Sequence, residues 1–313
     1  MDNFERNPPL RGVSEAKTYN SGLWNVLVIG GSRGTGYQIA LAYLERAYTV
    51  TFLVRDKSTF DSDGTIRAFI AGGQVKVVEG DALVEADVRK AWDGALKHGA
   101  GPTRGIDTVA FCLGGSIGYT WATGVTLTPH NIVTRGLQAL FCSLPLQSSP
   151  NTKLTIVSSS GVFPESFNNL PWALRQATSY GLLPAHRDKR SAERLIAHVA
   201  GWTWDDARFG PIPEEEEREM YDGARGWRER EGMPAVGALL EQLAVVRPLL
   251  LTDGDCMGDK TKDELAGAEP YRVETLNSTN AWSISRKDVA HFIVKATTSR
   301  WEQYKGSAVY LAY

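Results

Sequence analysis

Three glycines near the N-terminus have a spacing that can bring backbone N–H groups close to a phosphate. Gly30, Gly34 and Gly36 form the pattern G-x-x-x-G-x-G within GGSRGTG. Because glycine has no Cβ, the first can form a tight turn, the second lets the backbone approach a pyrophosphate, and the third allows close helix–strand packing. Such a turn indicates dinucleotide binding only where it joins a buried strand to a helix N-terminus.

The segments on both sides of these glycines have that order. Residues 24–29 (WNVLVI) are an apolar run typical of a strand buried on both faces, and the apolar residues after the turn recur at helical spacing. We therefore expect a dinucleotide at this turn, with Ser32, Arg33 and Thr35 also near it. An ordinary strand–helix loop is the alternative.

The residue that ends the next expected strand, residues 48–54, indicates which nucleotide binds. NAD sites usually place a carboxylate there, about 20 residues beyond the glycines, to bond the ribose 2′-hydroxyl. This chain has Arg55, whose planar guanidinium suits a 2′-phosphate, and Arg33 could join it. We expect NADP(H), although Asp56 beside Arg55 counts against it and both arginines could be solvated surface charges.

The rest of the chain alternates strand-like and helix-like segments. Strands are expected at residues 74–79, 106–112, 153–158, 243–251 and 308–312. Helices are expected at residues 85–97, 129–144, 188–199 and 288–297. This order predicts an α/β fold, a Rossmann-type doubly wound parallel sheet with right-handed crossovers.

One long region, residues 201–235, interrupts the alternation. It holds Trp202, Trp204 and Trp227 and no expected strand. Ligands of such sheets bind beyond the carboxyl ends of the strands, so we expect this helical insert to be a lid-like segment over that end. A peripheral helix packed by its tryptophans, or a subunit contact, is the alternative.

The domain organisation follows from these segments. We expect one Rossmann domain over residues 23–312, which contains the insert and a small C-terminal substrate region, after an N-terminal extension of residues 1–22.

Composition excludes several other classes of protein. The 313 residues include 34 basic and 36 acidic ones, a net charge of −2, so there is no basic footprint for nucleic acid or an anionic membrane surface. Three cysteines without a CxxC pair and five scattered histidines favour neither a disulfide framework nor a metal site. Without an apolar run typical of a signal peptide or a membrane span, we expect a cytoplasmic monomer or homodimer.

The residues GGSRGTG, Arg55 and Gly80-Asp81 resemble the short-chain dehydrogenase/reductase superfamily. The likeness continues through LGG at residues 113–115, IVSSSG, DKRSAERL, VRPLLLTDG and SRKDVA. The last three motifs are similar to the atypical branch, the NAD(P)H-binding proteins related to NmrA-like regulators and biliverdin-reductase-B-like enzymes. The resemblance covers about residues 24–312 with one large gap.

The resemblance implies further contacts with the cofactor beyond the glycine turn. The residues concerned on the nicotinamide side are Leu113, Gly114, Gly115, Lys189, Pro248 and Leu250. The first three would line the nicotinamide ribose, Lys189 would bond that ribose, and the last two would meet the carboxamide. Asp81, with Ala82 beside it, could meet the adenine amino group, or Asp81 could simply cap the next turn.

The resemblance also implies catalytic positions, with one departure. Ser160 falls where the superfamily has a serine that bonds a substrate oxygen, and Lys189 looks like the lysine of the YxxxK motif. Ala185 stands where the tyrosine of that motif belongs, so the usual proton donor in carbonyl reduction is missing. The candidate replacements are His186, Tyr180, Tyr119 and a bound water. His186 could instead be a capping or surface residue, and Ser160 a buried strand-end serine.

These residues lead to one leading expectation and two alternatives. We expect an NADP-dependent oxidoreductase that transfers hydride between NADPH and a small apolar carbonyl, enone or hydroxylated ring substrate, to which Trp202 or Trp204 would offer aromatic surface. The missing tyrosine keeps open a non-catalytic NmrA-like NADP(H)-binding regulator. A non-redox isomerase or dehydratase on the same fold is the third possibility.

Overall fold

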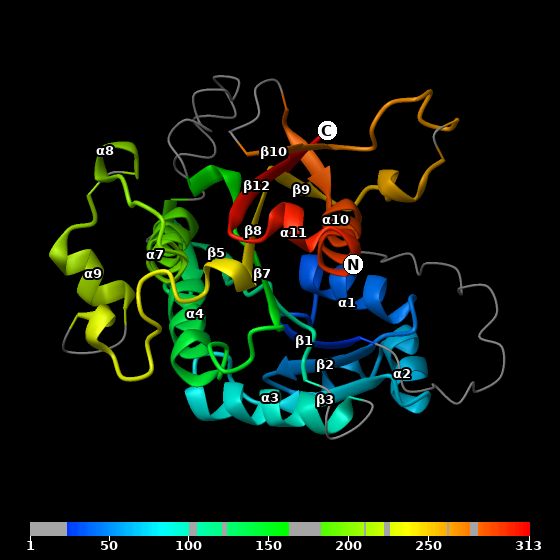
Figure 1. Cartoon of the computed structure of the whole chain (residues 1–313), viewed down its shortest axis with the longest axis horizontal. Helices are drawn as coiled ribbons and strands as arrows, with labels where there is room; N and C mark the ends of the chain where they lie inside the picture. The colour runs from blue at the N-terminus through cyan, green and yellow to red at the C-terminus, as the bar shows by residue number, and fades with distance from the viewer. Residues whose placement is uncertain are drawn as a thin grey trace.

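The centre of the molecule is an eight-stranded sheet with strand order β10-β12-β8-β7-β4-β1-β2-β3 (Figure 1). The computed structural model describes residues 24–99, 105–120, 124–162, 183–209, 211–221, 226–261, 263–275 and 281–313. The strands are β1 (Asn25–Ile29), β2 (Thr49–Val54), β3 (Val75–Glu79), β4 (Thr108–Phe111), β7 (Lys153–Val157), β8 (Leu243–Pro248), β10 (Arg272–Glu274) and β12 (Ser307–Ala312). All neighbouring strands pair in parallel except β10, which pairs antiparallel with β12.

Helices cover both faces of this sheet, which explains why apolar residues occupy both faces of its central strands. The helices are α1 (Gly34–Leu44), α2 (Gly64–Ala71), α3 (Glu85–His98), α4 (Ile132–Ser143), α7 (Leu183–Ala200) and α10 (Arg286–Ser299). In β1, Val26 and Val28 pack with α1, α2 and α10, whereas Leu27 and Ile29 pack with α3, α4 and α7. Each side chain of β1 is therefore buried, as expected for a parallel sheet between two helical layers.

The strand order reverses direction between β1 and β4. From β1 the chain proceeds outward to β2 and β3, and from β4 it proceeds the other way to β12. The loops after β1 and β4 consequently leave the sheet side by side, and a Cβ on Gly30 would lie 2.7 Å from the carbonyl carbon of Cys112. This is the switch point at which open α/β sheets bind ligands, and the predicted doubly wound α/β fold is confirmed.

Some local expectations differ from the structure. The strand expected at residues 243–251 is two strands, because Leu249 leaves β8 and the chain then forms β9 (Leu250–Thr252), which pairs in parallel with β11 (Ser283–Ser285). An antiparallel hairpin of β5 (Ser116–Thr120) and β6 (Gly124–Thr128) follows β4 and was not predicted. Within the described residues, no helix is long and apolar enough to cross a lipid bilayer.

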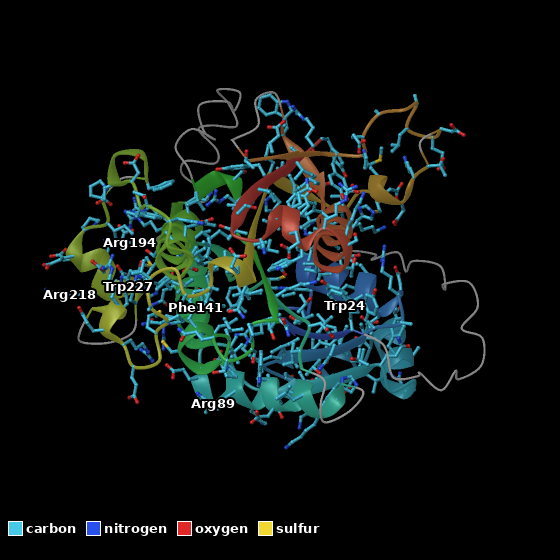
Figure 2. All side chains as sticks on the ribbon, viewed as in Figure 1. Trp24, Arg89, Phe141, Arg194, Arg218 and Trp227 are labelled. Atoms are coloured by element: carbon cyan, nitrogen blue, oxygen red, sulfur yellow. The ribbon has the colours of Figure 1, made fainter. Side chains whose placement is uncertain are left out.

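The insert lies alongside α7 (Figure 1), and Arg190 and Arg194 of that helix pair with Glu216 and Glu217 of the insert. It contains α8 (Asp206–Phe209) and α9 (Glu214–Met220). Trp227 is 1% exposed, stacks on Tyr221 at 5.2 Å between ring centroids, and donates a hydrogen bond to Glu217 at 2.9 Å. Figure 2 shows Trp227 near Arg194 of α7, with Arg218 at the outer edge. Trp227 is thus a packing residue of the insert and lies next to His198 of α7, while the lid stays a prediction.

Candidate functional site

The N-terminus of α1 has the features of an anion-binding site. Its N-cap residue, Arg33, provides no capping hydrogen bond, and the first turn holds no acidic residue. The neighbouring helices are different, since Asp63 caps α2 and Ser285 caps α10. The first N–H groups of any helix lack backbone acceptors and carry partial positive charge. At α1 these donors have neither a side-chain cap nor an acidic residue in the first turn, which suits a phosphate.

The three glycines have the conformations and contacts that such a site needs. Gly30 and Gly34 have φ angles of +85° and +61°, which only glycine adopts readily. A Cβ on Gly36 would lie 2.3 Å from the carbonyl oxygen of Gly30, so α1 can approach β1 only because that atom is missing. Around Gly114, apart from its two chain neighbours, no atom of the part of the chain that the structure describes lies within 4 Å of the corresponding position, and Ser32, Arg33 and Gly34 are exposed. The turn is closely packed at Gly30 and Gly36 and exposed to solvent at Ser32, Arg33 and Gly34. The residues present therefore fit a dinucleotide.

The carboxylates next to the expected nucleotide positions have local partners. Asp56 accepts hydrogen bonds from the backbone N–H and the hydroxyl of Ser58 at 2.8 and 2.7 Å, and these bonds lower the pKa of Asp56. Arg55 lies exposed directly after β2. Asp81 Oδ1 accepts from the backbone N–H of Leu83 at 2.9 Å, which is the turn-capping alternative. Ala82 beside it is buried.

Three of the predicted catalytic residues come together where β7 ends and α7 begins. Lys189 Nζ donates to the carbonyl oxygen of Ser158 at 3.1 Å. Ser160 is 7% exposed in the single turn that follows. A Cβ on Gly161 would lie 2.7 Å from His186 Nε2, so the imidazole packs directly against this turn. Tyr180 and the side chain of Tyr119 lie outside the described residues.

Burial lowers the pKa of both basic groups in this cluster, and neighbouring carboxylates oppose that effect only at Lys189. Burial, and to a lesser degree the neighbouring Lys189, lower the pKa of His186 to about 4. Burial also lowers the pKa of Lys189, while the carboxylates of Asp188 and Glu193 oppose that effect. At pH 7 the imidazole is therefore neutral, able to donate or accept a hydrogen bond but not to act as an imidazolium acid.

Two buried carboxylates hold α7, and with it Lys189, in place. Asp188 is fully buried and accepts the backbone N–H groups of Val133 and Thr134, both at 2.8 Å, which supplies the missing cap of α4. Glu193, 2% exposed, pairs in bidentate fashion with Arg247 of β8 at 3.0 and 2.8 Å. This ion pair connects the sequence motifs DKRSAERL and VRPLLLTDG. Its two residues are 54 positions apart, so local spacing in the sequence does not reveal it.

The remaining expected residues lie in different surroundings. Pro248 is buried at the end of β8, whereas Leu250 is 65% exposed. Trp202 donates to the carbonyl oxygen of Gly306, just before β12 begins, at 3.2 Å. It therefore lies at the amino ends of the strands, and the expectation that Trp202 faces a substrate is wrong.

Sequence reasoning missed an aromatic contact beside the Ser160 turn. Phe209 of α8 packs with Val162 and Tyr310, and its ring lies 4.5 Å from that of Trp204 between centroids. Val162 ends the turn that begins at Ser160. Through α8, the insert thus reaches the carboxyl ends of the strands.

The comparisons with known proteins agree with this fold. No protein-family model matches the chain, and no curated protein matches its sequence. Its structure is similar to the anaerobillin reductase ChuY of Escherichia coli O157:H7, with a TM-score of 0.51, 14% identity, and coverage of 92% of this chain and 96% of that one. A short-chain dehydrogenase from Streptomyces avermitilis has a TM-score of 0.53, 14% identity, and coverage of 94% and 90%. The oxidoreductase ylbE from Lactococcus lactis has a TM-score of 0.51, 11% identity, and coverage of 92% and 90%.

At these identities the likeness establishes the fold. The chain shares the fold of a solved short-chain dehydrogenase over nearly its whole length, so the resemblance found in its motifs is confirmed at the level of architecture.

Proposed function

We propose that the chain is an NADP(H)-dependent oxidoreductase acting on a small apolar carbonyl, enone or hydroxylated ring compound. The observation that carries this proposal is the N-terminus of α1, which faces outward at the switch point and has neither a side-chain cap nor an acidic residue in its first turn. Exposed Arg55 at the end of the neighbouring strand suits a 2′-phosphate.

The residues that would hold the nucleotide come from the glycine turn, the segments after β2, β3 and β4, the end of β8, β9 and α7. They are Gly30, Ser32, Arg33, Gly34, Thr35, Gly36, Arg55, Asp81, Ala82, Leu113, Gly114, Gly115, Lys189, Pro248 and Leu250. When bound, NADPH supplies a hydride. The chain itself must supply a binding site for the substrate oxygen and a proton for that oxygen.

Ser160 and Lys189 are suited to those two tasks. The Ser160 hydroxyl, on a buried turn at the end of β7, can bond the substrate oxygen and orient it. Lys189 Nζ donates to the Ser158 carbonyl and can also donate to a substrate oxygen, whereas His186, with a pKa of about 4, is neutral at pH 7. We assign the proton to Lys189 Nζ and a hydrogen-bonding role to His186. Phe209 and Trp204 offer apolar surface for the substrate.

Cofactor choice is tested by titrating the protein with NADPH and with NADH while tryptophan fluorescence is recorded. We expect NADPH to bind at least about tenfold more tightly, since a charge-assisted bond to a phosphate contributes on the order of 1.5–3 kcal/mol. Arg55→Gln should remove this preference. Arg67→Gln, which removes an exposed arginine from α2, is the matched control and should keep it. Equal binding of both nucleotides would contradict the NADP assignment.

Turnover is tested by following NADPH oxidation with quinones, ketones and enones. Ser160→Ala should raise KM and lower kcat, and Lys189→Ala should also weaken nucleotide binding. If NADPH binds but no substrate oxidises it, the redox proposal fails.

Ala185 in the tyrosine position favours a regulator as the second candidate, for which a cofactor-dependent pull-down should recover a protein partner.

A further inference from the structure

Arg286, at the start of α10, lies next to the glycine turn although some 250 residues separate the two in sequence. We propose that Arg286 binds the pyrophosphate of the nucleotide, from the side of the turn opposite the backbone of α1, and that Asp253 competes with the phosphate for it. This inference rests on the proposed function and extends it to a residue for which the sequence motifs indicated no role.

The position of Arg286 follows from strand pairing. In the parallel pair β9 and β11, Thr252 is opposite Ser285. Asp253 and Arg286 each follow these partners by one residue, so they leave the pair side by side. Arg286 Nη1 donates to Asp253 Oδ1 at 2.6 Å.

The packing of α10 along α1 then brings the guanidinium to the turn (Figure 1). A Cβ on Gly34 would lie 3.8 Å from Arg286 Nε; among the described residues beyond its chain neighbours and the backbone of α1, no other atom lies within 4 Å of that position. The guanidinium thus borders the open side of the turn, where the first N–H groups of α1 are exposed.

Arg286 lies beside the N-termini of two helices, and the carboxylates near it are Asp253 and Asp288. Helix N-termini carry partial positive charge, so a cation at the first position of α10 and beside the N-terminus of α1 is in an electrostatically poor place. At α10 this is offset by Ser285 and Asp288, but α1 has no such group among the described residues. Asp253 is 88% exposed, so its attraction is weakened by solvent.

A pyrophosphate would satisfy both groups of donors at once. Its oxygens can accept from the N–H groups of α1 and from the planar fork of a guanidinium, which matches phosphate geometry. Arg286 is 27% exposed and so remains accessible from solvent. Because Asp253 holds the same guanidinium before binding, the nucleotide must exchange one carboxylate contact for a phosphate contact.

The experiment measures dissociation constants of NADPH and NADH for the full chain, by calorimetry or tryptophan fluorescence. Arg286→Gln should weaken both nucleotides by the same factor, about tenfold or more, because both contain the pyrophosphate. Asp253→Asn should tighten both by roughly two- to fivefold, and the double variant should match Arg286→Gln alone. Lys295→Gln removes an exposed charge further along α10 and should change neither constant.

Each other outcome overturns a definite part of the inference. If Arg286→Gln weakens NADPH alone, the arginine contacts the 2′-phosphate; if it changes neither constant, it contacts no phosphate. Asp253 is exposed, so Asp253→Asn should not affect folding. If this variant binds the nucleotides more weakly, Asp253 orients Arg286 rather than competing with the phosphate for it. If the unaltered protein binds neither nucleotide, the proposed function itself has failed, which these measurements distinguish from a failure at Arg286.

Discussion

His186 should make the folded state sensitive to mild acid. Its imidazole is packed against the Gly161 turn, and burial lowers its pKa to about 4 from an ordinary value of 6.5. When the chain unfolds the ring returns to water and regains its ordinary pKa. Between pH 6.5 and 4 the unfolded state therefore binds a proton that the folded state does not, so stability is complete above this range and is lost as the pH falls through it.

The two pKa values set the size of the effect. At pH 7 the unfolded ring is mostly neutral, so the linkage is negligible, whereas at pH 5 it is almost fully protonated and the folded ring is not. The free energy of unfolding should thus fall by about 2 kcal/mol between pH 7 and pH 5 because of this one residue. With a urea m-value of about 3 kcal/mol per molar, the midpoint difference is roughly 0.6 M.

The assay is urea unfolding at pH 7 and pH 5, for the natural protein and for His186→Gln. Burial lowers the pKa of His98, His198 and His291 as well, so the natural protein should lose stability through all four rings and the comparison isolates one of them. We expect the variant to lose about 2 kcal/mol less. An NMR titration should place the ring of His186 near pKa 4. Parallel pH dependence in the two proteins, or a measured pKa above 6, would refute the reasoning.

Two further predictions concern the packing around α7. Glu193→Gln should lower the free energy of unfolding by about 3–5 kcal/mol, because it leaves the buried guanidinium of Arg247 without its carboxylate. Glu274→Gln, at the exposed pair with Arg272, is the matched control in the same urea assay and should change it by less than about 0.5 kcal/mol. Trp227→Ala should lower the free energy of unfolding by about 3–5 kcal/mol through the cavity it leaves, and limited proteolysis should then cut the insert first while NADPH binding persists.

The strands were predictable where both of their faces are buried, because such strands do not need to alternate apolar and polar residues. Residues 24–29 are largely apolar for this reason, and β1 lies within them; in residues 153–158 the apolar positions Leu154, Ile156 and Val157 belong to β7. The hairpin of β5 and β6 was not predictable on the same basis. Its strands are short, Gly118 interrupts one of them, and the connecting residues WAT lack the Asn-Gly or Asp-Gly signal of a tight turn.

Some parts of the candidate site were likewise predictable from the sequence, and others were not. The glycine turn was predictable because its requirements are local, a left-handed backbone at Gly30 and Gly34 between one strand and one helix. Pairing between Glu193 and Arg247 depends on how α7 packs on β8, and the approach of Arg286 to Gly34 depends on how α10 packs on α1. Neither leaves a periodic signal in the sequence, because tertiary packing alone determines both.

Ala185 stands where the expected YxxxK motif would have its tyrosine, and the contacts around it show what such an exchange would leave in place. Asp188 and Glu193 fix α7 through buried bonds to α4 and β8, and Lys189 lies between them on the same helix. None of these contacts involves Ala185, so exchanging the tyrosine for alanine leaves the position of the lysine unaffected. In the proposed function, nucleotide binding and proton donation are therefore separable. The nucleotide contacts do not require residue 185, and the proposed proton donor, Lys189, keeps its place on α7 without a tyrosine there.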